Sequence, residues 1–175
     1  MKKISWLILM MFPLFVCAQE VQRWTEDDRK YLLENLIRSR DELIKETQGL
    51  SKKQSTFKES EDRWSINQVV EHLAIFELVF DREIGIALRG KPQPEFNKDV
   101  KPDSYYSDFI MEETPHVTIE YTKPFTYSVP MGLNELSSNV AWFTKMRNES
   151  VEYVKTTKED LRLYYRNAGS TNVHQ

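Results

Sequence analysis

The chain has 175 residues, of which 40% are hydrophobic and 29% charged, with 5 glycines, 1 cysteine and a formal net charge of −3. These values are typical of a single globular domain and exclude collagen-like, disulfide-stapled and low-complexity proteins. The acidic balance argues against a nucleic-acid partner, because phosphate binding needs a basic surface.

Residues 1–18 have the layout of a secretory signal peptide. Lys2 and Lys3 precede the apolar run 4–16, and Ala18 offers a small residue for cleavage. The apolar run is shorter than the ~20 residues of a spanning helix, so we expect cleavage, with an uncleaved anchor as the alternative. Cleavage predicts an exported protein, periplasmic or extracellular, made of residues 19–175 with no stable membrane span. It also removes Cys17, the only cysteine and the only thiol nucleophile.

Three amphipathic helices are predicted, over residues 25–47, 65–89 and 133–156, because apolar residues recur there at helical spacing. Capping boxes mark the first two starts, with Thr25 three residues before Asp28 and Ser65 three residues before Gln68. The polar residues 50–63 between these two helices predict a loop.

Residues 91–130 form a long crossover that contains every proline except Pro13. Apolar residues alternate along 117–129, which predicts an extended segment with one buried face. We expect Tyr105, Tyr106 and Phe109 to cover the bundle, the alternative being a lid or a partner surface. Three helices, a long crossover and little strand predict an all-α bundle.

The histidines are His72, His116 and His174, and none lies in a familiar metal or catalytic motif. His72 flanks the apolar face of its predicted helix, so we expect a half-buried, hydrogen-bonded side chain, with a ligand role as the alternative. Arg147 lies on the apolar stripe of the third helix. It is expected to form a buried ion pair with Glu77 or Glu71, the alternative being a clamp for a substrate anion.

The segment 64–74, Trp-Ser-Ile-Asn-Gln-Val-Val-Glu-His-Leu-Ala, together with Glu77, resembles the second helix of the DinB-like superfamily. Arg147 inside an apolar stripe is similar to the third helix of that superfamily. The resemblance covers roughly residues 25–175 and implies an up-down-down-up four-helix bundle, whose course requires a long crossover between helices two and three.

The resemblance also implies a divalent metal, often zinc or nickel, held by three histidines. His72 matches the ligand on helix two, whereas the His-x-x-x-His pair of the last helix has no counterpart here. Residues 173–175 look like the start of that helix, so His174 lies too early to be a ligand, and His116 is expected to be an exposed loop residue. The fourth helix is therefore expected to be largely missing, in either a C-terminally truncated product or a degenerate member without metal.

Two functions follow as hypotheses. The first is an exported DinB-like protein whose metal-dependent hydrolase or thiol-transferase chemistry on a small molecule is incomplete. The second is a non-enzymatic helical binding protein of the cell envelope that uses the aromatic crossover as its contact surface. Without a fourth helix the apolar stripes would be exposed, which predicts instability or pairing into a homodimer.

Overall fold

The computed structural model describes residues 23–111, 128–167 and 173–174. Over these residues the regular secondary structure is almost wholly helical, which confirms the all-α fold class. The predicted signal peptide, His116 and most of the alternating segment 117–129 lie outside the described residues. In the described part of the chain, no helix has the length and apolar character needed to cross a membrane.

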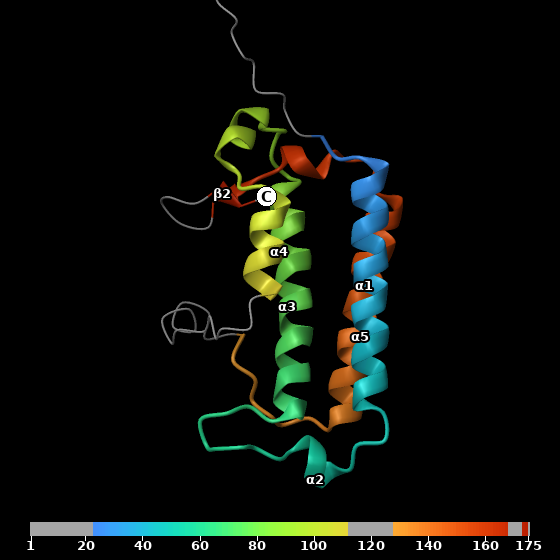
Figure 1. The fold of residues 1–175 in the computed structure, drawn as a ribbon. Helices are drawn as coiled ribbons and strands as arrows, with labels where there is room; N and C mark the ends of the chain where they lie inside the picture. The colour runs from blue at the N-terminus through green and yellow to red at the C-terminus, as the bar shows by residue number, and fades with distance from the viewer. Residues whose placement is uncertain (1–22, 112–127, 168–172, 175) are drawn as a thin grey trace, which may run out of the picture.

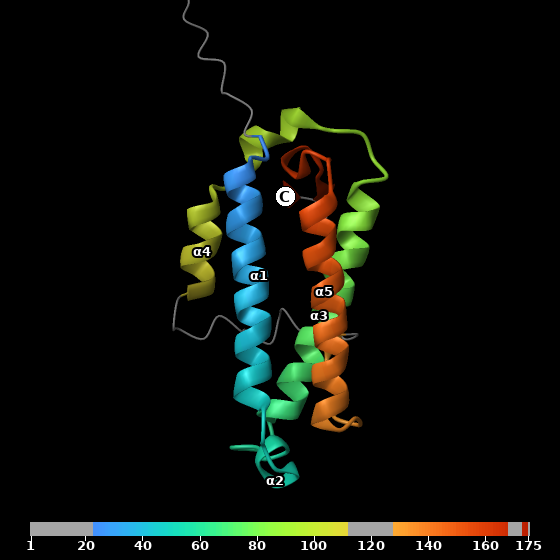
Figure 2. The same ribbon diagram turned by 90° about the vertical axis from the view of Figure 1, so that its right-hand side faces the viewer.

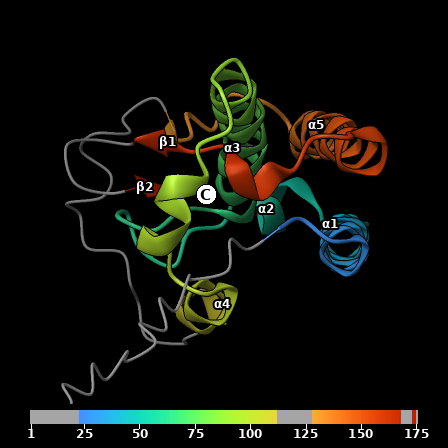
Figure 3. The ribbon, with the colours of Figure 1, turned by 90° about the horizontal axis from the view of Figure 1, so that it is seen from above.

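Three long helices dominate the described residues: α1 (Glu26–Thr47), α3 (Ile66–Ala87) and α5 (Leu136–Thr156). They confirm the three predicted helices. In Figure 1, α1 runs opposite to α3 and α5, which run parallel to each other because the long crossover returns the chain to the same end. Seen along the bundle in Figure 3, α5 lies between α3 and α1 and packs against both.

Local capping explains where these helices begin. The Thr25 hydroxyl accepts a hydrogen bond from the Asp28 N–H while the Asp28 side chain accepts one from the Thr25 N–H, and Ser65 and Gln68 repeat this exchange at α3. Both predicted capping boxes are therefore confirmed. A third box at Ser51 begins the short helix α2 (Lys52–Ser55), so the predicted loop 50–63 is not wholly irregular.

The core lies mainly between α3 and α5. Val70 and Ala74 of α3 are buried there, as are Phe143 and Met146 of α5. By contrast, α1 contributes no buried residue. It is attached to α5 partly through polar contacts, such as the hydrogen bond from the Arg29 guanidinium to the carbonyl of Val154 and the one from Arg40 to Asn148.

The crossover contains the 3-10 helix η1 (Pro94–Asp99) and the helix α4 (Asp103–Met111). Figures 2 and 3 show α4 standing off the three long helices, on the side of the bundle away from α5. Tyr105 and Tyr106 pack edge to face with ring centroids 5.4 Å apart, and both are exposed. The expectation that they cover the bundle is therefore wrong for these two residues, and the side chain of Phe109 lies outside what the structure describes.

After α5, the chain forms the 3-10 helix η4 (Leu161–Leu163) and two short strands, β1 (Arg166–Asn167) and β2 (Val173–His174). The strands pair antiparallel, with Arg166 opposite His174. The expectation that residues 173–175 open a fourth helix is therefore wrong for Val173 and His174. Their backbone groups pair with β1, a contact distant in sequence that helical periodicity does not reveal.

Candidate functional site

His72 lies near the N-terminal end of α3 between two aromatic rings. The ring centroids of Trp64 and Phe76 each lie 4.6 Å from that of His72. Its Nδ1 lies 2.8 Å from the carbonyl oxygen of Ser128. Because a carbonyl only accepts hydrogen bonds, Nδ1 must donate, and in the neutral ring Nε2 is then the nitrogen without a proton. The half-buried, hydrogen-bonded histidine expected from the sequence is confirmed.

A three-histidine metal centre does not fit the residues that the structure describes. Among them, no group of three His, Cys, Asp or Glu side chains could hold a metal ion. His174 belongs to β2, which lies beside the opposite end of α3 from His72 in Figure 1, and His116 lies outside the described residues. Since catalytic zinc uses three protein ligands, His72 alone does not make such a site, and its ligand role stays a prediction.

Glu71, beside His72, holds the returning end of the crossover against α3. Its buried carboxylate accepts hydrogen bonds from the backbone N–H groups of Met131 at 3.1 Å and Gly132 at 2.7 Å. Gly132 has a φ of +69°, and a Cβ there would lie 3.3 Å from Cγ of Gln68. The positive φ favours glycine at this position, and any larger residue would also force the Gln68 side chain to shift. Glu71 and His72 therefore act together as an anchor for residues 128–132.

Arg147 is paired with Glu77, one of the two acidic partners that the sequence predicts. The other, Glu71, accepts hydrogen bonds from backbone N–H groups instead. The distance from Arg147 Nη2 to Glu77 Oε1 is 2.6 Å, and the two side chains are 14% and 9% exposed. Arg147 also donates to the Ser39 hydroxyl at 2.7 Å and to the carbonyl of Leu36 at 3.3 Å. One guanidinium therefore joins α5 to both α3 and α1. This is a structural role, and these contacts occupy the Arg147 guanidinium that the sequence offered as a clamp for a substrate anion.

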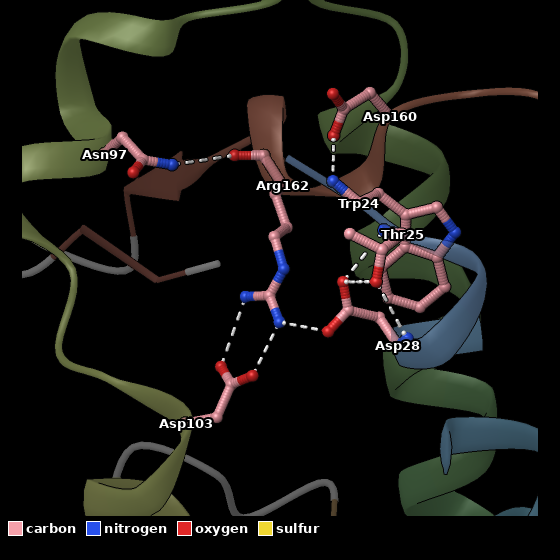
Figure 4. A network of polar contacts seen from close by, with 7 residues as sticks. All are labelled: Trp24, Thr25, Asp28, Asn97, Asp103, Asp160 and Arg162. Carbon is pink, nitrogen blue, oxygen red and sulfur yellow. Dashed lines mark hydrogen bonds and ion pairs between the residues drawn. The ribbon is translucent and has the colours of Figure 1, made fainter. Parts of the chain in front are cut away.

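A second buried arginine, Arg162 of η4, joins three segments distant in sequence (Figure 4). Its guanidinium contacts the Asp28 carboxylate at 3.0 Å and the Asp103 carboxylate at 2.5 Å, while Asn97 donates to its backbone carbonyl. The hydrogen bond from Arg162 lowers the pKa of Asp28 to about 2, and that from Thr25 acts in the same direction. The carboxylates, that of Asp103 first, raise the pKa of Arg162. We call this cluster the Arg162 clasp, and no local sequence signal marks it.

The most apolar stripe of α3 is not the face that packs in the core. The buried face of α3 includes Val70 and Ala74 but also Asn67, Glu71 and Glu77. A quarter turn or so around the helix lies a row of apolar side chains that are 37–55% exposed. We call this row the α3 stripe; it consists of Ile66, Val69, Leu73, Phe80 and Ile84.

The α3 stripe extends along about 27 Å of helix, since each residue rises ~1.5 Å. In the view along the bundle, α4 runs on the side away from α5 (Figure 3). A contiguous exposed apolar row of this kind is typical of an interaction surface in a folded protein. The sequence shows the stripe plainly, but its periodicity predicts burial and not exposure.

The comparisons with known proteins add no relative. No family model, no curated protein and no solved structure matches the chain.

Proposed function

We propose that the chain is a helical binding protein with a DinB-like course, and that it binds an amphipathic helix of a partner protein on the α3 stripe. The observation that carries the proposal is the exposure of this stripe while a more polar face of the same helix is buried. An apolar row along one helix suits a helical partner, which presents its own apolar residues at matching spacing.

The arrangement of the long helices supports a helix as the occupant. In an up-down-down-up bundle, the fourth helix would run along the side left open by the first three, and α1, α3 and α5 provide that side (Figure 3). The stripe is long enough for about five turns of helix. A helix seated beside it would also meet α1, which has no buried residue and so has apolar surface left to cover.

The apolar area of the α3 stripe limits the free energy of binding that a partner helix can gain there. Full burial of a Val, Leu, Ile or Phe side chain stabilises by ~1.5–3 kcal/mol, so covering the exposed parts of the five stripe residues gives roughly 5 kcal/mol. Association costs at least ~4 kcal/mol, and often more, in lost freedom. The α3 stripe alone therefore gives weak binding, and a stable complex requires contacts on α1 as well.

The test uses a fluorescent synthetic amphipathic peptide of about 18 residues, with leucines at helical spacing on one face and lysines elsewhere. Fluorescence anisotropy measures its affinity for the wild-type chain and for two matched variants. Leu73→Gln changes the stripe, whereas Leu78→Gln changes a leucine of α3 that is also exposed but lies on the other side of the helix. We expect Leu73→Gln to weaken binding about threefold or more, and Leu78→Gln to leave it nearly unchanged.

Equal effects of the two variants, or no peptide binding by the wild type, would overturn the proposal. A homodimer is the competing occupant of the same face. Sedimentation of the wild type and of Leu73→Gln separates the two cases. A dimer that dissociates in Leu73→Gln identifies a second copy as the partner, and a monomer in both leaves the face to another protein.

Export is a further part of the proposed function, and its support is the amino-terminal pattern Lys2, Lys3, 4–16 and Ala18. Expression with a carboxyl-terminal tag in a bacterium with an outer membrane, followed by fractionation and N-terminal sequencing, tests it. A product beginning at Gln19 in the periplasm or medium supports the proposal, and a full-length product in the cytoplasm contradicts it.

A metal-dependent enzyme is the second candidate, and one observation favours it. His72 donates through Nδ1 to a carbonyl and leaves Nε2 without a proton, as metal-binding histidines typically do. Zinc or nickel titration by calorimetry compares the wild type with His72→Ala. Stoichiometric binding that is lost in His72→Ala favours this candidate, and the absence of heat in the wild type rejects it.

A further inference from the structure

We propose that α4 is a strap that closes over the C-terminal half of the α3 stripe and competes with the partner helix there, tethered at its start by the Arg162 clasp. This inference rests on the proposed function, because it concerns access to the same face. Its evidence is the position, the chemistry and the tethering of α4.

The position of α4 is the first support. Figure 1 shows α4 level with the half of α3 that leads to its C-terminal end, and Figure 3 shows it set apart from α3, on the side of the bundle away from α5. The buried face of α3 is turned to α5. In Figure 3 the right-handed helix α3 runs towards the viewer, so successive residues advance anticlockwise, and at ~100° per residue the α3 stripe lies about 110° clockwise of the buried face. The stripe therefore faces the side of the bundle on which α4 runs. Phe80 and Ile84 are the stripe residues nearest that end.

The chemistry of α4 matches an apolar seat. Tyr105 and Tyr106 of α4 are exposed, as are Phe80 and Ile84 of the stripe. A short helix with exposed aromatic rings gains free energy by covering apolar surface, and aromatic side chains bring a large contact area to such a seat. Closing α4 onto α3 removes both exposed apolar surfaces from water in one step.

The tethers at the two ends of the crossover make closure intramolecular. At one end Asp103, the first residue of α4, binds Arg162, whose side chain is 8% exposed. At the other end Ser128 and Gly132 are held by His72 and Glu71 near the start of α3. Because both anchors and α3 belong to one chain, α4 meets the stripe in an intramolecular step, at a high effective concentration. The Asp103 side chain is 63% exposed, which leaves the tether at the surface, where it can act as a hinge.

A disulfide trap tests the closure. In the full chain with Cys17→Ser, the pair Tyr106→Cys and Ile84→Cys places one thiol on α4 and one on the stripe. The control pair, Tyr106→Cys with Lys145→Cys, uses the outer face of α5, where the lysine side chain is 73% exposed. We expect rapid oxidation of the first pair and slow oxidation of the control. Oxidation of the first pair should also weaken binding of the amphipathic peptide about tenfold, and reduction should restore it.

Asp103→Asn provides a second test that leaves the fold intact, because Arg162 keeps its contact with Asp28. With the tether weakened, we expect slower disulfide formation in the first pair and tighter peptide binding. Equal oxidation rates for the two pairs, or peptide binding that is unaffected by the disulfide, would overturn the strap while leaving the proposed function standing. A wild-type chain that never binds the peptide rejects the proposed function instead, and the oxidation rates then decide closure alone.

Discussion

The substitution Arg147→Met tests the contact that joins the three long helices. Methionine retains much of the apolar length of arginine but removes the charge. In the wild type the Glu77 carboxylate is 9% exposed and lies 2.6 Å from the Arg147 guanidinium. In the variant this carboxylate keeps only the hydrogen bond from the Ser150 hydroxyl, at 3.2 Å. Loss of one partner from a buried pair costs ~3–5 kcal/mol. The lost hydrogen bond to Ser39 adds ~1 kcal/mol. Domains of this size are stable by only ~5–15 kcal/mol, so we expect a large fall in the urea midpoint measured by circular dichroism.

The matched control is Arg38→Met. Arg38 pairs with Glu42 at 2.9 Å, but the two side chains are 60% and 57% exposed, so water screens the pair and the expected cost is below ~1 kcal/mol. The double variant Arg147→Met with Glu77→Met should recover much of the loss, because no buried charge is left unpaired. Hydrogen exchange in α1 should rise in Arg147→Met and stay unchanged in Arg38→Met. Equal costs for the two single variants would refute a buried role for Arg147.

Three further predictions concern the anchors of the fold. The pKa of Asp28 is about 2 against an ordinary 3.8, so its contribution to stability is complete above about pH 4 and is lost as the pH falls towards 2. Asp28→Asn should therefore be less stable than the wild type at neutral pH. Urea titrations should show that the difference in the free energy of unfolding between the two proteins shrinks below pH 4. A difference that stays constant with pH contradicts the pairing with Arg162. Gly132→Ala should lower the free energy of unfolding by ~1–2 kcal/mol, because alanine would have to adopt a left-handed backbone and its Cβ would crowd Gln68. Unchanged thermal stability would speak against this close approach. Ser65→Ala should cost ~1 kcal/mol through loss of the capping box of α3, and an unchanged urea midpoint would contradict that role.

The features that depend on near neighbours in sequence could be predicted. The capping boxes at Thr25 and Ser65 and the bounds of the long helices follow from residues three or four positions apart, which face each other in any helix. The pairing of Arg147 with Glu77 could also be predicted, as one of two alternatives, because a charge on an apolar stripe needs an opposite charge nearby.

The features that depend on contacts between distant segments could not be predicted from the sequence. Nothing near Arg162 in the sequence indicates Asp28 or Asp103, because the clasp exists only when η4 meets the starts of α1 and α4. The strand pairing of His174 with Arg166 and the bond from His72 to Ser128 are set by tertiary contacts in the same way.

By itself the sequence determined which residues form the long helices and which stripe of α3 is the most apolar, since both follow from local spacing. Only the tertiary structure decided which side of α3 is buried. Asn67, Glu71 and Glu77 face inward because they find partners on α5 and on the chain that returns from the crossover. The α3 stripe remains exposed because burial depends on where a neighbour packs, and α5 packs roughly a quarter turn away.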